Sequence, residues 1–144
     1  MRAHSGRIRQ PGRGSEFLTF GPNRSVSNRE CPAQLDRAFE NARRALARAD
    51  RDSPAGDYEE VVLSAAVQLH AELVRIHPFE DGNGRSSRLL LNVVLVSYGL
   101  PPIEVERIKA EYNECLNHYF STSDLEPLLA LLLKTYDDPG KLLA

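Results

Sequence analysis

Apolar residues recur every three or four positions through most of the chain after residue 28, which is the spacing of one face of an α-helix. The first such stretch predicts a helix that is opened by the capping pair Ser27 and Glu30 and ends near Arg48. The second predicts a helix over residues 57–76, with Asp57 as its cap. We expect each of these two helices to bury one face and to leave the other in solvent.

The third apolar stretch differs from the first two, because residues 89–96 are apolar on every face apart from Asn92. It predicts a helix from Asn83 to about Tyr98 that forms the buried centre of a helical bundle. Gly99 and the two prolines that follow are typical signals for the end of a helix.

Two further helices are expected in the last third of the chain. In one, apolar residues at heptad-like spacing run from Val105 to Tyr119. The other is opened by a capping box formed by Ser123 and Glu126. Residues 1–28 contain too many glycines and prolines for a helix, and they predict a loop with a short β-hairpin.

A chain of 144 residues has the length of one domain. The pattern therefore predicts a single all-α domain with a short hairpin near its N-terminus. Within it we expect a flexible arm and hairpin at residues 1–28, a helical core at residues 29–136 and a tail at residues 137–144.

Composition excludes several classes of protein. The 42% hydrophobic and 26% charged fractions are ordinary for globular chains and exclude a collagen-like or wholly disordered protein. No run approaches the roughly 18 apolar residues that a membrane span needs. The two cysteines, Cys31 and Cys115, form neither a disulfide framework nor a metal-binding spacing, which favours a reducing compartment such as the cytoplasm.

The net charge of −2 combines an arginine-rich first third with an acidic remainder. A basic segment can meet nucleic acid, an anionic nucleotide or an acidic partner protein. No aromatic residues alternate with these arginines, so the sequence does not favour a dedicated nucleic-acid surface.

The residues that carry chemistry are concentrated between the second and third predicted helices. Residues 77–85 hold a histidine, two acids, two glycines, an asparagine and an arginine, a set that packing alone does not explain. Glycines at a helix start open the backbone N–H groups of residues 82–84 to an anion, and the helix dipole adds positive potential there. Arg85 and Arg88 can hold further phosphate oxygens, so the segment predicts a phosphate site.

Three neighbouring side chains complete this candidate site. Asp81 stands beside the phosphate site, and a carboxylate there suits Mg²⁺, which binds one or two carboxylates together with phosphate oxygens. His77, with an ordinary pKa of about 6.5, suits a proton acceptor near neutrality. Phe79 has the bulk to anchor the loop in the core beneath it. The alternative interpretation is that His77 is a core histidine and that Asp81 and Glu80 are solvated acids. Proximity to the phosphate site favours a functional role for His77 and Asp81, but not for Glu80.

The segment resembles the signature of Fic domains. The matching positions, in order, are His77, Phe79, Asp81, Gly82, Asn83, Gly84, Arg85 and Arg88. Weaker similarity covers roughly residues 6–136, and within it residues 6–9 and 17–22 resemble the region around the family's hairpin flap. The resemblance implies a Fic-type helical bundle with a flap, and an enzyme that transfers AMP from ATP to a Ser, Thr or Tyr hydroxyl of a target protein.

The resemblance also implies a role for each matched residue. His77 would be the general base on the target hydroxyl, and Asp81 would hold Mg²⁺. The flap, placed near residues 17–20, would pair with an extended segment of the target protein. The residues expected to bind ATP are Gly82, Asn83, Gly84, Arg85, Arg88 and Phe79.

Many Fic proteins are restrained by a glutamate that pairs with the second arginine of the signature. The only candidate of that spacing here is Glu126, which follows Thr122 by four residues, but Pro127 comes next and the predicted capping box explains the same residues. We therefore expect either a separate small antitoxin that supplies the glutamate, as in a toxin–antitoxin pair, or no restraint at all.

Other functions remain open alternatives. A related branch of the family phosphorylates its targets, but it carries a lysine where this chain has Gly84. Transfer of another nucleotide or of phosphocholine is a second alternative, and a nucleotide-binding module without turnover is a third. The expected location is the cytoplasm, either of the producing cell or of a host cell that receives the protein.

Overall fold

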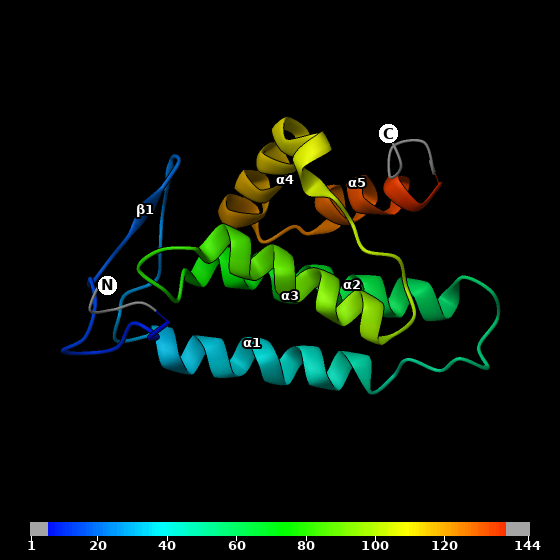
Figure 1. Ribbon diagram of the computed structural model, residues 1–144, viewed down its shortest axis with the longest axis horizontal. Helices are drawn as coiled ribbons and strands as arrows, with labels where there is room; N and C mark the ends of the chain where they lie inside the picture. The colour runs from blue at the N-terminus through cyan, green and yellow to red at the C-terminus, as the bar shows by residue number, and fades with distance from the viewer. Residues whose placement is uncertain (1–5, 138–144) are drawn as a thin grey trace.

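The computed structural model describes residues 6–137, which form a helical bundle with a small hairpin at one end (Figure 1). The elements are β1 (Thr19–Phe20), β2 (Asn23–Arg24), α1 (Cys31–Leu46), α2 (Asp57–Ile76), α3 (Asn83–Ser97), the 3₁₀ helix η1 (Val105–Ile108), α4 (Lys109–Thr122) and α5 (Glu126–Asp137). This confirms the all-α class with a short N-terminal hairpin. The first five residues of the expected arm and residues 138–144 of the expected tail lie outside the described residues, and the domain boundaries stay a prediction.

Helix α2 lies at the centre of the bundle and contacts α1, α3, α4 and α5 (Figure 1). Its buried residues are Val62, Leu63, Ala65, Ala66, Val67, Leu69, His70, Ala71, Leu73, Val74 and Ile76. The three alanines among them are small, which lets neighbouring helices approach closely. The central helix therefore delivers its C-terminal end, and the residues that follow it, to the middle of one end of the bundle.

Helix α3 is not the buried centre that its apolar sequence predicts. Only Leu91 and Leu95 are buried among its hydrophobic residues. Leu89, Val93 and Val96 are 66%, 50% and 57% exposed, respectively. The prediction was wrong because α3 packs one face against α2, and no helix among residues 6–137 covers the opposite face.

The start of α2 also differs from the prediction, whereas the turn expected before α1 forms. Gly56, and not Asp57, is the N-cap of α2, and its N–H donates to Glu59 Oε2 at 3.1 Å. The pair Ser27 and Glu30 does form a turn before α1, because the Glu30 N–H donates to Ser27 Oγ at 3.2 Å.

The capping box expected before α5 does not form. Ser123 instead ends α4 in the left-handed conformation, with φ of 61°. Asp124 Oδ1 accepts the N–H of Glu126 at 3.1 Å and takes the capping role. Val105 and the three residues after it form η1, so the helix α4 begins later than its apolar spacing suggests.

A buried histidine joins three of the helices. His70 of α2 is 1% exposed, and its Nδ1 lies 3.0 Å from the Ser87 carbonyl oxygen of α3. Its Nε2 lies 2.5 Å from the hydroxyl of Tyr112 in α4. Burial lowers the His70 pKa to about 4, which the bond to Ser87 opposes and the charge of Arg88 reinforces. The neutral ring thus fixes the first turns of α3 against α2 and α4.

No helix among residues 6–137 is both long enough and apolar enough to cross a membrane.

Candidate functional site

The candidate site begins where α2 ends. His77 is the C-cap of α2 in the left-handed conformation, with φ of 55° and ψ of 63°, and its N–H donates to the Leu73 carbonyl at 3.0 Å. Pro78 follows and cannot extend the helix. A non-glycine residue in this conformation needs support from its surroundings, because the left-handed region is unfavourable for residues with a Cβ atom.

The His77 ring is held on two sides. Its plane stacks on the Phe20 ring of β1, with the ring centroids 4.0 Å apart and the planes 5° from parallel. Its Nδ1 lies 2.9 Å from the Val74 carbonyl oxygen. Because a carbonyl oxygen only accepts, Nδ1 carries the proton of the neutral ring, and Nε2 is the atom that can accept another.

Electrostatics favour the neutral form of this ring. Burial lowers the His77 pKa below its ordinary value, the bond to Val74 opposes that shift, and the positive charge of Arg9 adds to it. The lowered pKa therefore favours an uncharged His77 imidazole at physiological pH.

The loop from α2 to α3 is closed by the side chain of Asn83. Asn83 Nδ2 donates to the Phe79 carbonyl at 2.7 Å, and Asn83 Oδ1 accepts the Phe79 N–H at 2.9 Å. Asn83 is only 6% exposed. Its side chain therefore satisfies the backbone of the loop, a role that the sequence analysis did not foresee.

The two motif arginines fold back over the two motif glycines. A Cβ atom at Gly82 would lie 3.4 Å from Arg85 Nη2, and one at Gly84 would lie 3.0 Å from Arg88 Nη1. Side chains of an α-helix lean toward its N-terminus, so both guanidinium groups gather at the start of α3. The positive end of the helix dipole lies there as well, which makes this end of α3 an anion site with two added charges.

The second arginine has an acidic neighbour. Arg88 Nη2 lies 3.6 Å from Oε1 of Glu106, and their side chains are 31% and 57% exposed, respectively. Glu106 belongs to η1 and not to the position expected for a restraining glutamate. The sequence offered no signal for it, because the two residues are far apart in the chain and η1 matches no motif.

The two acids of the loop have different surroundings. Glu80 accepts bonds from the N–H and the hydroxyl of Ser15, the latter at 3.0 Å, so it ties the N-terminal arm to the loop. Asp81 is exposed, and its Oδ1 accepts the Gly82 N–H at 2.8 Å. No group of three or more metal-binding side chains exists in the described part of the chain. A cation at Asp81 would therefore need oxygens from a bound ligand, as Mg²⁺ at phosphates has.

Two hollows flank the loop. One, of about 320 Å³, lies between the hairpin and α4 and is lined by Phe20, Gly21, Pro22, Asn23, Val74, Asn113, Leu116, Asn117 and Phe120. The other is an apolar groove of about 270 Å³, lined by Ile8, Leu35, Phe39, Leu73, Pro78, Phe79, Asn83, Ser86, Ser87 and Leu90. Phe79 thus lines a half-open groove and anchors the loop beside α1 and not in a closed core.

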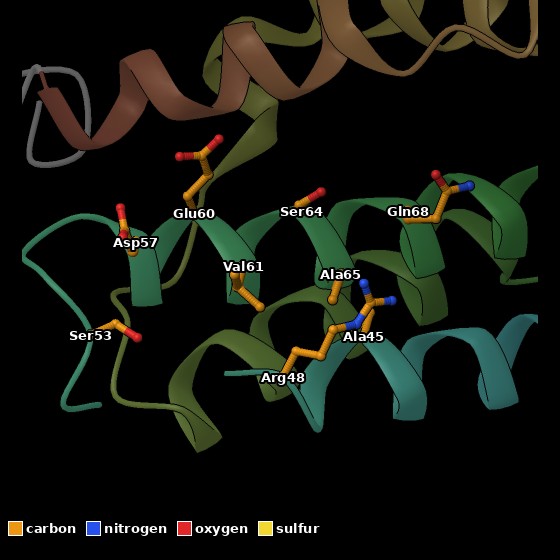
Figure 2. A pocket seen from close by; sticks show the side chains of 9 residues that line it. All are labelled: Ala45, Arg48, Ser53, Asp57, Glu60, Val61, Ser64, Ala65 and Gln68. Carbon is orange, nitrogen blue, oxygen red and sulfur yellow. The ribbon is translucent and has the colours of Figure 1, made fainter. Parts of the chain in front are cut away.

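A third hollow lies away from the loop. It has a volume of about 610 Å³ and is lined by residues from the end of α1, the following loop and α2 as far as Gln68 (Figure 2). Figure 2 shows Glu60, Ser64 and Gln68 in a row along α2, with Arg48 on the α1 side. None of the residues expected to act in catalysis lines it, so the candidate site is at the other end of α2.

All the residues expected at the site lie on one loop and the first two turns of α3, and the hairpin adds Phe20 to them. Sequence reasoning missed Arg9 and Glu106. It placed Phe20 in the flap but did not foresee that its ring stacks on His77. For Arg9 a signal existed, since residues 6–9 resemble the region around the flap of Fic domains.

Comparison with known proteins identifies curated relatives of this chain. It is 40% identical over 73 residues to protein adenylyltransferase fic-1 of Caenorhabditis elegans, which is 50% of this chain and 14% of the relative. It is 39% identical over 70 residues to protein adenylyltransferase Fic of Nematostella vectensis, covering 48% and 16% of the two chains. Its match to protein adenylyltransferase Fic of Drosophila sechellia is 32% identical over 104 residues, 55% of this chain and 21% of the relative. The shared region is thus less than a quarter of each relative.

The family comparison covers more of the chain. The model of the Fic/DOC family matches residues 3–95, which include the hairpin, α1, α2 and the whole of the motif from His77 to Arg88. Since the matched region exceeds half of the 144 residues, the chain belongs to the Fic/DOC family.

Proposed function

We propose that this protein transfers AMP from ATP to a Ser, Thr or Tyr hydroxyl of a target protein. The observation that carries the proposal is the arrangement at the end of α2, where a neutral imidazole precedes an anion site with two guanidinium groups. The names of the relatives support it, since each is a protein adenylyltransferase.

In the proposed reaction the hydroxyl oxygen of the target attacks the α-phosphorus of ATP. A new P–O bond forms, the bond from the α-phosphorus to the bridging oxygen breaks, and pyrophosphate leaves with that oxygen. The hydroxyl proton moves to Nε2 of His77, whose Nδ1–H stays on the Val74 carbonyl. The stack on Phe20 fixes the plane in which Nε2 can meet that proton.

The start of α3 would bind the triphosphate. Backbone N–H groups of Asn83 and Gly84 and the helix dipole suit the α- and β-phosphates. The Gly82 N–H would join them by exchanging its bond to Asp81 for one to phosphate. Arg85 and Arg88 suit the β- and γ-phosphates. These contacts would orient the α-phosphorus with its leaving group opposite the attacking oxygen.

Asp81 would be the carboxylate that holds Mg²⁺. Glu80 accepts two bonds from Ser15, whereas Asp81 is exposed beside the start of α3 and bonds the Gly82 N–H. One carboxylate and phosphate oxygens are a donor set that Mg²⁺ accepts, and the ion would neutralise phosphate charge when bound.

One feature favours AMP transfer over the phosphotransferase alternative, and another gives a place for the target. A side chain at position 84 would press on Arg88 Nη1, so the glycine leaves room for Arg88 at the phosphate site. The hairpin β1–β2 has only two strands, so an extended target segment could pair with its outer edge next to Phe20. A toxin role held in check by an antitoxin, and a cytoplasmic location, remain part of this proposal.

The test uses ATP labelled at either the α- or the γ-phosphate, incubated with the protein and a cell lysate. AMP transfer labels a protein only from the α-position, whereas a phosphotransferase labels it only from the γ-position. Parallel reactions with α-labelled GTP, UTP and CTP distinguish the nucleotide alternative.

The matched variants are His77→Ala and His118→Ala. Loss of a general base costs about 10²–10⁴-fold in rate, while ATP binding measured by calorimetry should persist. His118 is exposed and pairs with Asp124 in the α4–α5 region, so its replacement should leave transfer unchanged. Transfer that survives in His77→Ala would reject this mechanism.

A further inference from the structure

Arg9 is a fully buried arginine whose side-chain hydrogen bonds go to backbone carbonyl oxygens. It is 1% exposed and heads the largest fully buried side chains of the protein. Its guanidinium donates to the carbonyl oxygens of His77 (2.7 Å), Ile76 (2.8 Å), Val26 (2.9 Å), Ser15 (3.2 Å) and Glu16 (3.2 Å). A buried charge is costly, and these carbonyl dipoles are what compensate it.

Three of the contacts fall on consecutive residues of the site. The Arg9 side chain holds the carbonyls of Ile76 and His77, and the Arg9 N–H donates to the Pro78 carbonyl at 2.8 Å. These are the residues where α2 ends and the chain turns through the left-handed conformation of His77. Three bonds from one residue can therefore maintain a turn that the backbone alone disfavours.

The remaining contacts reach the hairpin. Ser15 and Glu16 precede β1 and Val26 follows β2, so the same guanidinium holds both sides of the hairpin stem. The hairpin in turn carries Phe20, which stacks on the His77 ring. His77 is thus fixed through its backbone and through its ring by structures that share Arg9.

We propose that Arg9 is a positioning residue for the transfer reaction, which holds the His77 turn and the flap in register with each other. This inference rests on the proposed role of His77 as the base. Arg9 acts through His77 and the hairpin, and we assign it no contact with the reacting atoms.

The planar fork of arginine is what the geometry requires. Its Nε and Nη2 meet two adjacent carbonyls on one side while Nη1 meets the hairpin stem on the other. A lysine keeps the charge but replaces the fork with one ammonium group, which cannot reach both sides in the same way. A methionine keeps much of the volume and removes both charge and donors.

The positive charge of Arg9 also affects the pKa of His77, and this effect gives the experiment a second readout. Arg9 is the charged group of the arm that faces His77, while the hairpin presents the uncharged Phe20 ring. Its positive charge lowers the His77 pKa in addition to burial. Removing the charge should raise that pKa, and keeping the charge without the fork should not.

The experiment compares Arg9→Lys, Arg9→Met and the control Arg13→Met, which removes an exposed arginine from the same arm. Steady-state transfer from α-labelled ATP is measured from pH 5 to 9, with the melting temperature of each variant. We expect both Arg9 variants to lose about 10- to 100-fold in kcat, with KM for ATP within about threefold, because small displacements of a reacting group are costly. The acidic limb should move to higher pH in Arg9→Met alone, and the control should match wild type.

Wild-type protein provides a measurement that needs no variant to fold. The Arg9 Nε–H resonance should shift with pH at the midpoint of the His77 ring resonance, because Nε donates to the His77 carbonyl. If the Arg9 Nε–H resonance does not shift as the His77 ring titrates, the inference is overturned. So does a folded Arg9→Lys variant with wild-type kcat, or one in which kcat is kept and only KM for ATP rises.

The two proposals fail differently. If His77→Ala retains transfer, the proposed function fails, while the joint titration of Arg9 and His77 would still be observed. If His77→Ala is inactive and the Arg9 variants are fully active, only the role of Arg9 fails.

Discussion

Arg88 of the phosphate site lies 3.6 Å from Glu106, a carboxylate on η1 that the sequence did not single out. Both side chains are partly exposed, so water screens their attraction. Glu106 competes with any phosphate that Arg88 is to bind. Because an exposed ion pair is weak, this competition can lower the affinity for ATP only slightly.

The first prediction concerns this ion pair. A solvent-exposed pair contributes about 0–1 kcal/mol, so Glu106→Gln should tighten ATP binding by at most about fivefold. The matched control is Glu126→Gln, which alters the glutamate at the spacing of a restraining residue. Calorimetry with ATP and Mg²⁺ measures both.

These variants also test the expectation that the isolated protein is active. Wild type should transfer AMP without any added activator, and neither variant should raise kcat sharply. A gain of several hundredfold in Glu126→Gln would mean that this chain carries its own restraint, and that no antitoxin is needed to explain it.

The second prediction is the pH dependence of transfer. The base must be neutral to accept a proton, and burial holds the His77 pKa below its ordinary value of 6.5. Activity should therefore be constant around neutral pH and fall only as the pH drops below that value. The profile is measured at saturating ATP and Mg²⁺, so that changes in nucleotide binding do not enter. A midpoint at or above pH 7.5 would contradict the assignment.

The positions of the helices were predictable because each has a local signal. The bounds of α2 and α3 follow from apolar spacing together with Gly56, Pro78 and Gly99, which act on the nearest turn only. The exposed face of α3 was not predictable from its own residues. Whether Leu89 and Val93 are covered depends on how many other helices pack there, which is a property of the whole chain.

The same distinction holds for the candidate site. The motif from His77 to Arg88 is contiguous, so one loop and the first two turns of α3 place its residues near one another along the chain. Arg9 reaches His77 across 68 residues of sequence, and Glu106 reaches Arg88 from η1. Contacts of this kind have no spacing signature, which is why sequence reasoning identified the reacting groups and missed those that position them.

The third prediction separates stability from nucleotide binding at Gly84. Alanine in place of glycine within a helix usually stabilises by about 0.5–1 kcal/mol. Its Cβ would lie 3.0 Å from Arg88 Nη1, however, and would push the guanidinium away from the phosphate site. Gly84→Ala should therefore melt at an equal or higher temperature and bind ATP several-fold more weakly.

Ser86→Ala is the control for this change, because Ser86 is exposed in the same turn of α3. It should leave ATP affinity unchanged, as measured by the same titration. If Gly84→Ala binds ATP as tightly as wild type while its melting temperature rises, Arg88 has a different place in the complex from the one proposed.

The last prediction concerns stability and depends on His70, which is separate from the proposed chemistry. Burial holds the folded-state His70 pKa at about 4, whereas the unfolded chain has the ordinary value near 6.5. Above pH 6.5 neither state is protonated, and the stability that the neutral ring contributes is fully present. As the pH falls from 6.5 toward 4, His70 binds a proton in the unfolded state but stays neutral in the folded state. The free energy of unfolding should therefore decrease by up to about 1.4 kcal/mol per pH unit.

Urea unfolding between pH 7.5 and 4.5 measures this decrease, and His70→Gln provides the comparison. Carboxylates such as Glu72, whose pKa is lowered through its bonds to Arg75 and Tyr119 despite partial burial, add to the slope in both proteins. The contribution of His70 is therefore the difference between the wild-type and variant slopes in this pH range. Equal slopes would show that the ring can be protonated in the folded protein. In that case its bonds to Ser87 and Tyr112 do not exclude the charged form, and another group fixes the start of α3.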